Sequence, residues 1–425
     1  MKNRADIVIV GTGVAGLYCA LNLPHDKDIL LITKSEIDKS DSFLAQGGIC
    51  VMYDESDYDS YFEDTMRAGH YENRKESVDI MLRSSRDVID ELIRIGVDFA
   101  RNDDGSLKFT REGAHSRPRI CFHEDTTGKE ITQKLICAVR KLSNVRIIEN
   151  LSMIDITETD NRCTGIIARY PDGTLTQIQA KFTVFATGGI GGLFNNSTNF
   201  AHLTADAIAI AIKHGIELEN PDYVQIHPTT LFTMTKGRKF LISESVRGEG
   251  AVLLDANKNR FTDELQPRDV VSKAIWKQMK KDGTHHVWLS MKPIPKEDIL
   301  THFPNIYEHC LNEGYDVTKE CIPVVPAQHY FMGGIKVDKY SKTTMDNLYA
   351  AGETSCNGVH GKNRLASNSL LEALVFAKRA AIDIAKHFDE YDVIDQDVVL
   401  DDYIDCDKDY QKIARREIER IDDDE

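Results

Sequence analysis

The sequence lacks any arrangement of cysteines that would cross-link a fold or hold a metal. Its nine cysteines form an odd, scattered set without a Cys-x-x-Cys pair. We therefore expect no disulfide framework and no zinc or iron–sulfur site. Unpaired thiols suit a reducing compartment, so the sequence predicts a cytoplasmic protein.

Long hydrophobic runs are also missing. No apolar stretch approaches the roughly 20 residues that cross a bilayer. The chain enters the strand-like segment ADIVIV without a basic and then apolar leader. We expect neither export nor insertion into a membrane.

Positive charge is scarce relative to negative charge. The 52 Lys and Arg are outnumbered by 68 Asp and Glu, which leaves a formal net charge of −16. Nucleic acid is not an expected partner, because its phosphates select basic surfaces. Residues 391–425 contain 14 acidic and five basic side chains. We expect this acidic C-terminal tail to be solvated or partly helical, with partner binding as the alternative.

What the chain does have is the beginning of a nucleotide-binding fold. ADIVIV is typical of a buried strand, GTGVAG of a turn, LYCALNL of a short helix and DILLIT of a second strand. Gly11, Gly13 and Gly16 follow the first strand and open the helix. There they favour a tight turn, close approach to a pyrophosphate and close helix packing. The free N–H groups of the helix would face the phosphate.

Glycines also follow other strands of the predicted sheet. Dinucleotide folds that bind NAD carry an acidic residue after the second strand, where this chain has Thr33 and Lys34. The loop SDSFLAQGGI (40–49) could bring backbone N–H groups against a flat polar ring. Further glycines follow apolar strands in ATGGIGG (186–192) and YAAGE (349–353). Junctions spread this far along the chain favour one extended ligand, FAD.

The order of elements predicts two domains, as expected for 425 residues. Strand-like runs at VRIIE, CTGIIARY, KFTVFATGG and NLYAAGE, and an apolar-rich helix over 367–388, would extend the first sheet. Residues 238–332 have mixed short elements and several prolines. We predict an α/β fold with a Rossmann-like FAD-binding domain (1–237 and 333–390), an inserted α+β capping domain (238–332) and the acidic tail (391–425).

Arginine and histidine recur in compact polar groups, which are REGAHSRPR (111–119), QIHPT (225–229), ESVRGEG (244–250), QPRDVV (266–271), PAQHYFMGG (326–334) and HGKNRLASNSLLE (360–372). The planar fork of arginine matches a carboxylate, so convergent Arg and His side chains would bind a dicarboxylate. Singly, His227 could be a hydrogen-bonded core residue and Arg268 a surface partner of Asp269. The assembled set favours the pocket.

These groups resemble the flavoprotein family of succinate dehydrogenase, fumarate reductase and L-aspartate oxidase, and most of all its L-aspartate oxidase branch. The resemblance covers residues 5–385 and is strongest in AQGGI (45–49), TREGAHSRPRI (110–120), QIHPT (225–229), PRD (267–269), QHYFMGG (328–334) and NRLASNSLLE (363–372). It implies FAD-dependent oxidation of L-aspartate to iminoaspartate, with oxygen or fumarate as electron acceptor. The product would feed quinolinate and NAD biosynthesis, with coupling to a quinolinate synthase as a further expectation.

The resemblance also assigns residues to the cofactor. It implies FAD contacts for Gly11, Thr12, Gly13, Val14, Ala15, Gly16, Lys34, Asp41, Ser42, Phe43, Leu44, Ala45, Gln46, Gly47, Gly48, Asp206, Glu353, Ser369 and Leu370. A helix that begins near Ser367 would direct its positive end at the flavin. Members that link FAD covalently carry a histidine where this chain has Asp41. Non-covalent FAD is therefore expected.

Substrate contacts are implied as well. The carboxylates of the substrate would contact His227, Gln225, His329, Arg364 and Ser367. Arg268, from the capping domain, would lie at the reacting carbons, although an arginine with a pKa above about 12 rarely gives up a proton. Glu112 would face the amino group and favour L-aspartate over succinate. Arg268, His227 and Glu112 are thus the expected catalytic residues.

Two alternatives stay open at this point. A fumarate reductase or succinate dehydrogenase flavoprotein subunit would share the Arg and His pocket, but Asp41 and Glu112 argue against it. A flavin-binding regulatory protein without turnover is disfavoured by the completeness of the pocket. Many L-aspartate oxidases end in a further helical bundle, and we expect this sequence to be a short form without it.

Overall fold

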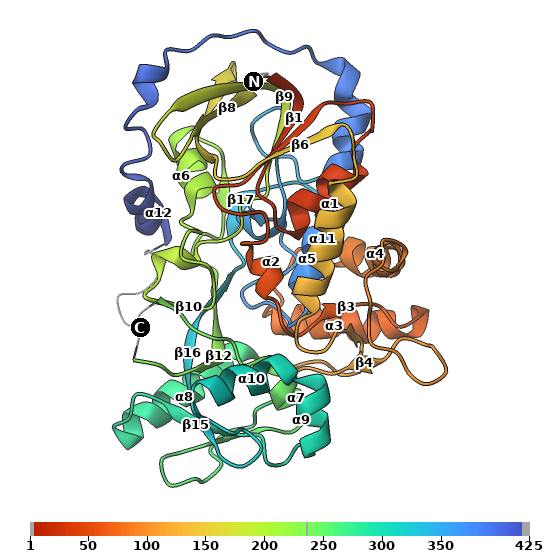
Figure 1. Ribbon diagram of the computed structural model, residues 1–425, viewed down its shortest axis with the longest axis vertical. Helices are drawn as coiled ribbons and strands as arrows, with labels where there is room; N and C mark the ends of the chain where they lie inside the picture. The colour runs from red at the N-terminus through yellow and green to blue at the C-terminus, as the bar shows by residue number, and fades with distance from the viewer. Residues whose placement is uncertain (1–3, 235–236, 419–425) are drawn as a thin grey trace.

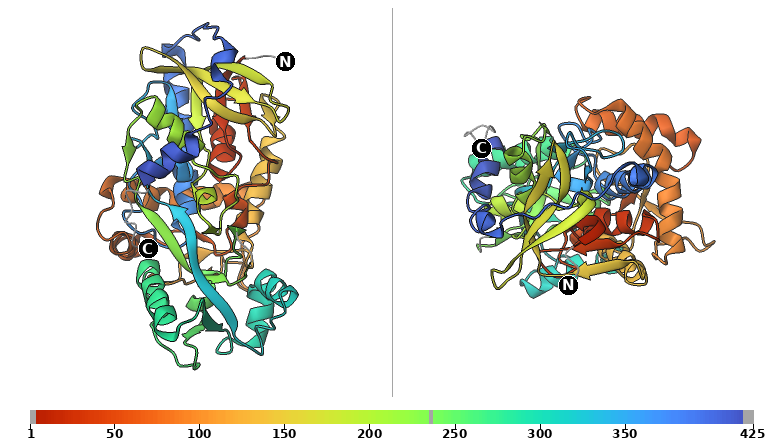
Figure 2. Two further views of the ribbon diagram at one scale, coloured as in Figure 1. Left: turned by 90° about the vertical axis from the view of Figure 1, so that its left-hand side faces the viewer. Right: turned by 90° about the horizontal axis from the view of Figure 1, so that it is seen from above.

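The computed structural model describes residues 4–234 and 237–418. An upper part is built on one large sheet, and a lower part has its own strands and helices (Figure 1). Strands β12 (Val224–Leu231) and β16 (Ile322–Phe331) run side by side from one part into the other (Figure 2). The chain thus leaves the upper part and returns to it. The domain boundaries at 237 and 333 stay predictions, because both parts share these continuous strands.

The large sheet has a parallel half and an antiparallel half. Its parallel strands are β6 (Val145–Ile148), β2 (Ile29–Ile32), β1 (Arg4–Val10), β9 (Leu175–Phe185) and β18 (Leu348–Ala350). The beginning of β9 also pairs with the antiparallel hairpin of β7 (Ser152–Thr159) and β8 (Arg162–Arg169). These strands confirm the apolar runs that predicted a sheet, and they confirm the α/β fold class.

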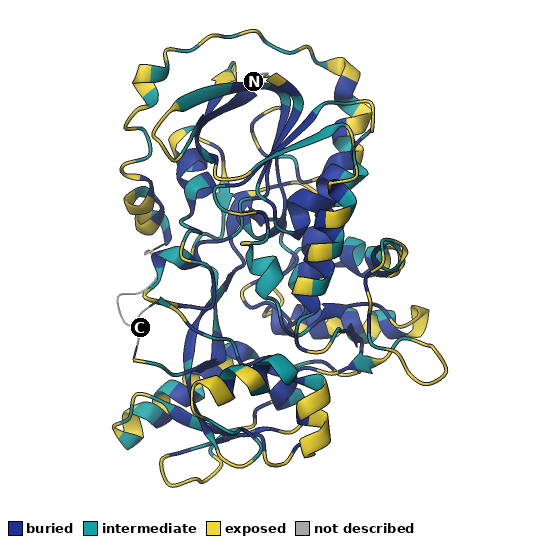
Figure 3. Cartoon of the chain, in the orientation of Figure 1, coloured by how far each residue is buried: buried dark blue, intermediate teal, exposed yellow. Residues whose placement is uncertain are grey.

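Helices cover both faces of this sheet, as a largely parallel sheet requires. Ile7 and Ile9 of β1 enter one core and Val8 and Val10 the other, because side chains alternate along a strand. The first core includes residues of α1 (Val14–Asn22), α4 (Lys75–Arg94), α5 (Thr127–Val139) and α11 (Asn368–His387). The second includes residues of α6 (Asp206–Lys213) and α12 (Tyr410–Ile418). Figure 3 shows the central strands as buried.

The lower part has a separate apolar core, whose buried residues lie between Leu231 and Val324. Its elements are α7 (Glu244–Gly248), β14 (Val252–Leu254), α8 (Arg268–Asp282), β15 (Val287–Ser290), α9 (Lys296–His302) and α10 (Pro304–Asn312). β14 and β15 pair antiparallel and join the edge of β16. This stretch therefore buries its own side chains beneath the large sheet.

The acidic segment after α11 lies along the upper part. Arg169 pairs with Asp407 at 2.6 Å, and the side chain of Gln177 donates to the backbone carbonyl of Gln396. Tyr410 and Ala414 of α12 are buried in the core beside α6. The expected helical part of this segment is confirmed, but the segment is bound to the sheet rather than free in solvent. Residues 419–425 lie outside the described residues.

Short elements complete the upper part between β2 and β6. They are α2 (Asp41–Leu44), β3 (Ile49–Cys50), α3 (Tyr58–Ala68), β4 (Phe109–Thr110) and β5 (Ile120–Cys121). We made no sequence prediction for α3 and α4, although the buried positions Val78, Leu82 and Ile89 of α4 have helical spacing. No helix among the described residues has both the length and the apolar character to cross a membrane.

Candidate active site

A cavity of about 520 Å³ lies where the two parts meet. Its wall includes residues that directly follow three parallel strands, namely Gly11 after β1, Ala186 after β9 and Ala351 after β18. The carboxyl ends of parallel strands form the ligand-binding edge of such sheets. Glu244 and Arg268 line the cavity from the lower part. Both parts therefore enclose one site.

The turn after β1 needs its glycines. Gly11 has a φ of +115°, and a Cβ there would lie 2.0 Å from the carbonyl oxygen of Ala186. A Cβ on Gly16 would lie 2.0 Å from the carbonyl oxygen of Gly11, so α1 packs directly on the turn. Gly13 is the N-cap of α1 and provides no side-chain acceptor. The helix N-terminus is thus open to an anion such as the pyrophosphate of FAD.

The cavity brings together the residues predicted to contact the cofactor, with one exception. Gly16 does not line the cavity, because it lies inside α1 against Gly11. Lys34 and Asp206 both line the cavity and form an ion pair of 2.6 Å. The Lys34 ammonium also donates to the Thr204 hydroxyl at 3.0 Å. Two residues far apart in the sequence are therefore fixed beside each other in the cavity wall.

Several buried polar atoms of the cavity wall have no hydrogen-bond partner among the described residues. They include Ser40 Oγ, Asp41 Oδ2 and Gln46 Oε1. Buried polar atoms are nearly always paired in native proteins. Burial raises the pKa of Asp41, and burial together with the charge of Asp41 raises the pKa of Glu353. A ligand with many hydroxyl and polar ring groups fits this wall, and FAD has both.

Helix α11 begins at the cavity. Ser369 and Leu370 of its first turn line the wall, as does its N-cap Ser367. Ser367 has a φ of +61°, a left-handed conformation that costs a residue other than glycine about 1–2 kcal/mol. The surrounding contacts must hold Ser367 in this conformation. The helix places its positive end at the cavity, as the sequence predicted.

Two arginines of the cavity wall meet at one carboxamide. Gln225 Oε1 accepts a hydrogen bond of 2.8 Å from Arg268 Nη1 and one of 3.3 Å from Arg364 Nε. Gln225 lies behind the arginines and does not line the cavity. Burial, with the nearby charge of Arg268, lowers the pKa of Arg364 to about 10. A bound dianion would relieve the repulsion between these guanidinium groups.

Two histidine rings lie next to the arginines, with centroids 5.1 Å apart. His227 is fully buried, and its Nε2 has no partner among the described residues. His329 Nδ1 lies 2.7 Å from the Thr198 hydroxyl. Burial, with the charge of Arg268, lowers the pKa of both histidines well below its usual value. Both rings are therefore neutral at neutral pH, and His227 can offer one N–H or one lone pair to a ligand.

Glu112 places a carboxyl group among these cations. It is buried, and its oxygens accept hydrogen bonds from the hydroxyls of Ser245 (2.8 Å) and Ser367 (2.6 Å). Burial raises the pKa of Glu112, and the charge of Glu244 adds to the rise. A cation bound beside Glu112 would stabilise its ionised form. The cavity thus has a place for an ammonium group.

Glu244 is a site residue that the sequence prediction missed. Its Oε2 accepts a hydrogen bond of 2.5 Å from Arg268 Nε, and Arg247 lies 3.5 Å from its other oxygen. Burial opposes ionisation of Glu244, but the charges of Arg268 and Arg247 outweigh it and lower the pKa. The motif ESVRGEG was the available signal, because an acid and an arginine three residues apart rarely cluster with glycines for folding alone.

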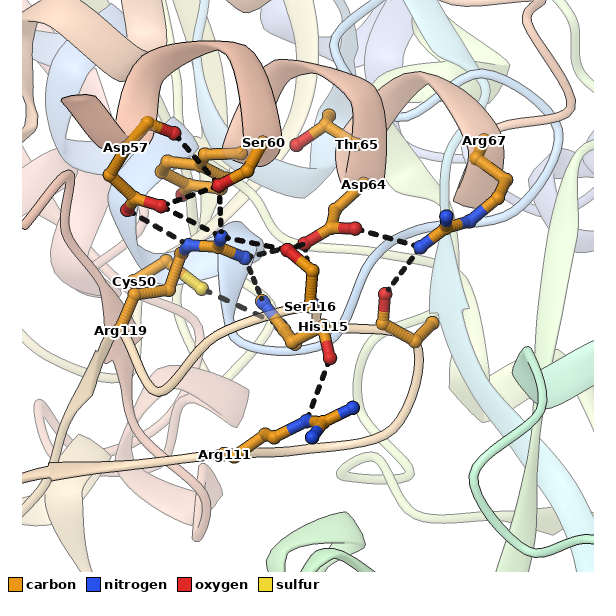
Figure 4. Close-up of polar contacts among 12 residues, drawn as sticks. Cys50, Asp57, Ser60, Asp64, Thr65, Arg67, Arg111, His115, Ser116 and Arg119 are labelled. Atoms are coloured by element: carbon orange, nitrogen blue, oxygen red, sulfur yellow. Dashed lines mark hydrogen bonds and ion pairs between the residues drawn. The ribbon is translucent and has the colours of Figure 1, made fainter. Parts of the chain in front are cut away.

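Not every arginine and histidine of the polar motifs faces the cavity. His115 and Arg119 of TREGAHSRPRI do not line it. They point into a buried cluster beneath α3 instead (Figure 4). Within this one motif, only Glu112 lines the cavity. The polar motifs therefore bring four of their Arg and His side chains to one cavity, namely Arg268, Arg364, His227 and His329.

Comparison with known proteins agrees with this site. Residues 6–370 match the family model described as FAD binding domain, which confirms FAD as the cofactor. An L-aspartate oxidase of Clostridium perfringens is 51% identical over 395 residues, covering 93% of this chain and 90% of the relative. An L-aspartate oxidase of Clostridium acetobutylicum is 51% identical over 385 residues, covering 90% and 88%.

The fold also has close structural relatives. It superposes on a quinol fumarate reductase of E. coli with a TM-score of 0.86 and 30% sequence identity, covering 97% of this chain and 74% of that one. This confirms the expected fold of the succinate dehydrogenase and fumarate reductase flavoproteins. The chain therefore belongs to the FAD binding domain family and, within it, to the L-aspartate oxidase group.

Proposed function

We propose that this protein oxidises L-aspartate to iminoaspartate. The observation that carries the proposal is the buried carboxyl group of Glu112, which lies in the same cavity wall as Arg268, Arg364, His227 and His329. The other carboxylate beside these residues, Glu244, is already paired with Arg268. A plain dicarboxylate needs only cationic and neutral donors, and a carboxylate in its pocket would weaken its binding. An amino acid brings an ammonium group that needs this partner. Bound FAD supplies the acceptor for the hydride that leaves the substrate carbon.

Arg364, His227 and His329 are the residues that we assign to the substrate carboxylates. Arg364 is held by Gln225 and stacks over the Tyr330 ring at 4.3 Å, so its fork is fixed before the substrate binds. The histidines are neutral, so they donate hydrogen bonds without adding charge repulsion. Pre-organised donors of this kind lose little entropy on binding. In this scheme Gln225 supports the arginines.

Arg268 and Glu244 form the pair that we assign to proton removal. Arg268 lines the cavity, and Glu244 is an ionised carboxylate bonded to its Nε. An arginine alone rarely releases a proton. Arg268 would pass its Nε proton to Glu244 along the short, charge-assisted hydrogen bond between them while the guanidinium takes up the proton that leaves the substrate carbon, so that its charge does not change. In this proposal the pair would let an arginine act at the reacting carbon.

Asp41 supports non-covalent binding of FAD. An aspartate at this position lacks the ring nitrogen through which a histidyl–flavin bond forms. Denaturation of the purified protein with acid should therefore release all of its flavin into the supernatant. Flavin that stays with the precipitated chain would contradict the assignment.

The main alternative function is a fumarate reductase or succinate dehydrogenase flavoprotein, because the fold superposes well on a quinol fumarate reductase. An anaerobic titration separates the two functions. The flavin absorbance of the purified protein should bleach with L-aspartate and not with succinate. Bleaching by succinate alone would favour the alternative, and bleaching by neither would indicate a flavin protein without this turnover. Adding oxygen or fumarate afterwards shows which acceptor restores the colour.

Glu112→Gln tests whether Glu112 binds the amino group of the substrate. The substitution keeps the size and one acceptor oxygen, replaces the other oxygen with an NH2 donor and removes the charge. We expect the ratio of kcat/KM for L-aspartate oxidation to kcat/KM for fumarate reduction to fall about 30-fold, the value of one hydrogen bond to a charged group. Steady-state kinetics with both substrates measure the ratio. Equal loss of both activities would disprove this role for Glu112.

Iminoaspartate is short-lived in water, so we propose that it is consumed by a quinolinate-forming enzyme on the route to NAD. Coupling to a quinolinate synthase and a cytoplasmic location are parts of this proposal.

A further inference from the structure

A fully buried ion-pair cluster lies behind the turn that carries Glu112 (Figure 4). Arg119 is its centre, and its side chain has no exposed surface. Its guanidinium donates to Asp57 at 2.9 and 3.1 Å and to Asp64 at 2.7 Å. Ser60 and Ser116 accept further hydrogen bonds from Arg119. The cluster therefore binds the turn to the beginning of α3.

Arg119 also determines which nitrogen of His115 carries the proton. Arg119 Nη1 lies 3.1 Å from His115 Nδ1. A guanidinium can only donate, so Nδ1 must be the acceptor. Burial, with the charge of Arg119, lowers the pKa of His115 to about 4, so the neutral ring carries its proton on Nε2. That N–H points at the carbonyl oxygen of Ala366, 3.0 Å away.

The turn of residues 112–115 is hydrogen-bonded at both of its ends to the dipeptide Ala366–Ser367. At one end, the Ser367 hydroxyl donates to Glu112 Oε2 at 2.6 Å. At the other end, His115 Nε2 donates to the carbonyl of Ala366. The N–H of His115 lies 3.3 Å from the carbonyl oxygen of Glu112 and closes the turn. Because Ala366 and Ser367 are neighbours, these bonds form a closed ring.

The ring explains how the strained Ser367 is held. Its left-handed φ of +61° needs outside contacts, and Ser367 has no capping bond of its own in α11. His115 fixes the peptide before Ser367, and the backbone N–H of Cys50 donates to the carbonyl of Ser367 at 3.0 Å. Without the His115 bond, the carbonyl of Ala366 keeps only the weak donor Cys50 Sγ, 3.4 Å away. The Ala366–Ser367 peptide is then held less firmly, and the Ser367 hydroxyl can move away from Glu112.

We propose that His115 is a positioning residue that sets the selectivity for an amino-bearing substrate, by clamping the Ala366–Ser367 peptide so that Ser367 holds Glu112 toward the ligand. The inference rests on the proposed function, because it assumes that Glu112 binds the amino group. Arg119, held by Asp57 and Asp64, acts indirectly, because it determines which nitrogen of His115 carries the proton. His115, Arg119, Asp57 and Asp64 do not line the cavity.

Two substitutions of His115 separate the clamp from general support of the fold. In His115→Asn, the amide oxygen replaces Nδ1 and can still accept from Arg119, but only the weak thiol donor of Cys50 then reaches the carbonyl of Ala366. In His115→Gln, the longer amide places an N–H near the position of Nε2. Asn therefore removes the clamp, and Gln restores it. His123→Asn is the matched control, because the His123 ring also bonds a backbone carbonyl, that of Asp98, away from the cavity.

We expect His115→Asn to lower the ratio of kcat/KM for L-aspartate oxidation to that for fumarate reduction about tenfold, the effect of one lost buried hydrogen bond. His115→Gln and His123→Asn should keep the wild-type ratio. In the double variant with Glu112→Gln, His115→Asn should add no further change, because both act through the same carboxylate. Melting temperatures and bound FAD are measured for each variant.

The outcomes distinguish this inference from the proposed function. If His115→Asn lowers the melting temperature but keeps the ratio, His115 only supports the fold and the inference is wrong. If His115→Gln does not restore the ratio, or if the effects of His115→Asn and Glu112→Gln add in the double variant, the proposed role of His115 is also wrong. If Glu112→Gln leaves the ratio unchanged, or the wild type does not oxidise L-aspartate, the proposed function fails and the inference falls with it.

Discussion

Arg268→Leu should lower the turnover of L-aspartate by at least about 10³-fold while FAD stays bound. Loss of a positioned charge and of a proton-transfer group each costs factors of this size. Arg268 begins α8 in the lower part and bonds only Gln225 and Glu244 among the described residues, whereas the glycine turns of the cofactor site lie in the upper part. Single-turnover kinetics and the flavin spectrum of the purified variant measure both effects.

Lys273→Leu provides the matched control for this experiment. Lys273 is an exposed cation of the same helix, and it does not line the cavity. Its removal should leave turnover near the wild-type value. Arg268→Lys keeps the charge but loses the fork that joins Gln225 and Glu244, so we expect it to restore little activity. Substantial turnover in Arg268→Leu would exclude Arg268 from proton removal.

Arg119→Met should lower the free energy of unfolding by about 3–5 kcal/mol, because it leaves the buried carboxylate of Asp57 without a counter-charge and that of Asp64 with only the half-exposed Arg67. In the native protein the pKa of Asp57 and of Asp64 is lowered: burial opposes their ionisation, but Arg119 and the hydroxyls of Ser60 and Ser116 outweigh it. Urea denaturation at neutral pH measures the loss. This effect on stability should exceed that of any exposed ion pair.

The pH dependence has a definite sign. A lowered carboxyl pKa stabilises the wild type above the usual carboxyl range, and this stabilisation is lost as the pH falls. In Arg119→Met the carboxylates of Asp57 and Asp64, which have lost Arg119, take up protons more readily. The difference in unfolding free energy between this variant and the wild type should therefore shrink at acidic pH. Arg67→Met is the control, because Arg67 pairs with the same Asp64 at 2.7 Å but is half-exposed. We expect it to cost less than about 1 kcal/mol, and an equal cost for both variants would contradict the argument.

The sequence alone was sufficient for the cofactor half of the site. Gly11, Gly13 and Gly16 follow a strand within a few residues, so their roles depend only on local geometry. The apolar runs that became β1, β2 and β9 are likewise local signals. FAD, the α/β fold and the family membership therefore followed from short stretches of chain. The amphipathic helices α3 and α4 have an equally local signal in their helical spacing of apolar residues.

The tertiary structure alone decided which polar residues form the substrate half. Arg119 and Arg268 both stand in short motifs with an acid nearby, yet Arg119 is enclosed by Asp57 and Asp64 while Arg268 faces the cavity. The hydrogen bond of Glu244 to Arg268 and the clamp between His115 and Ala366 likewise appear only in the tertiary structure, although the motif ESVRGEG marked the segment of Glu244. The physical reason is distance along the chain. The pairing of β12 with β16 brings the segments of Gln225 and His329 together, and the folded chain adds Arg268 from α8 and Arg364 from the segment before α11 to the same site. Local sequence patterns do not record these approaches.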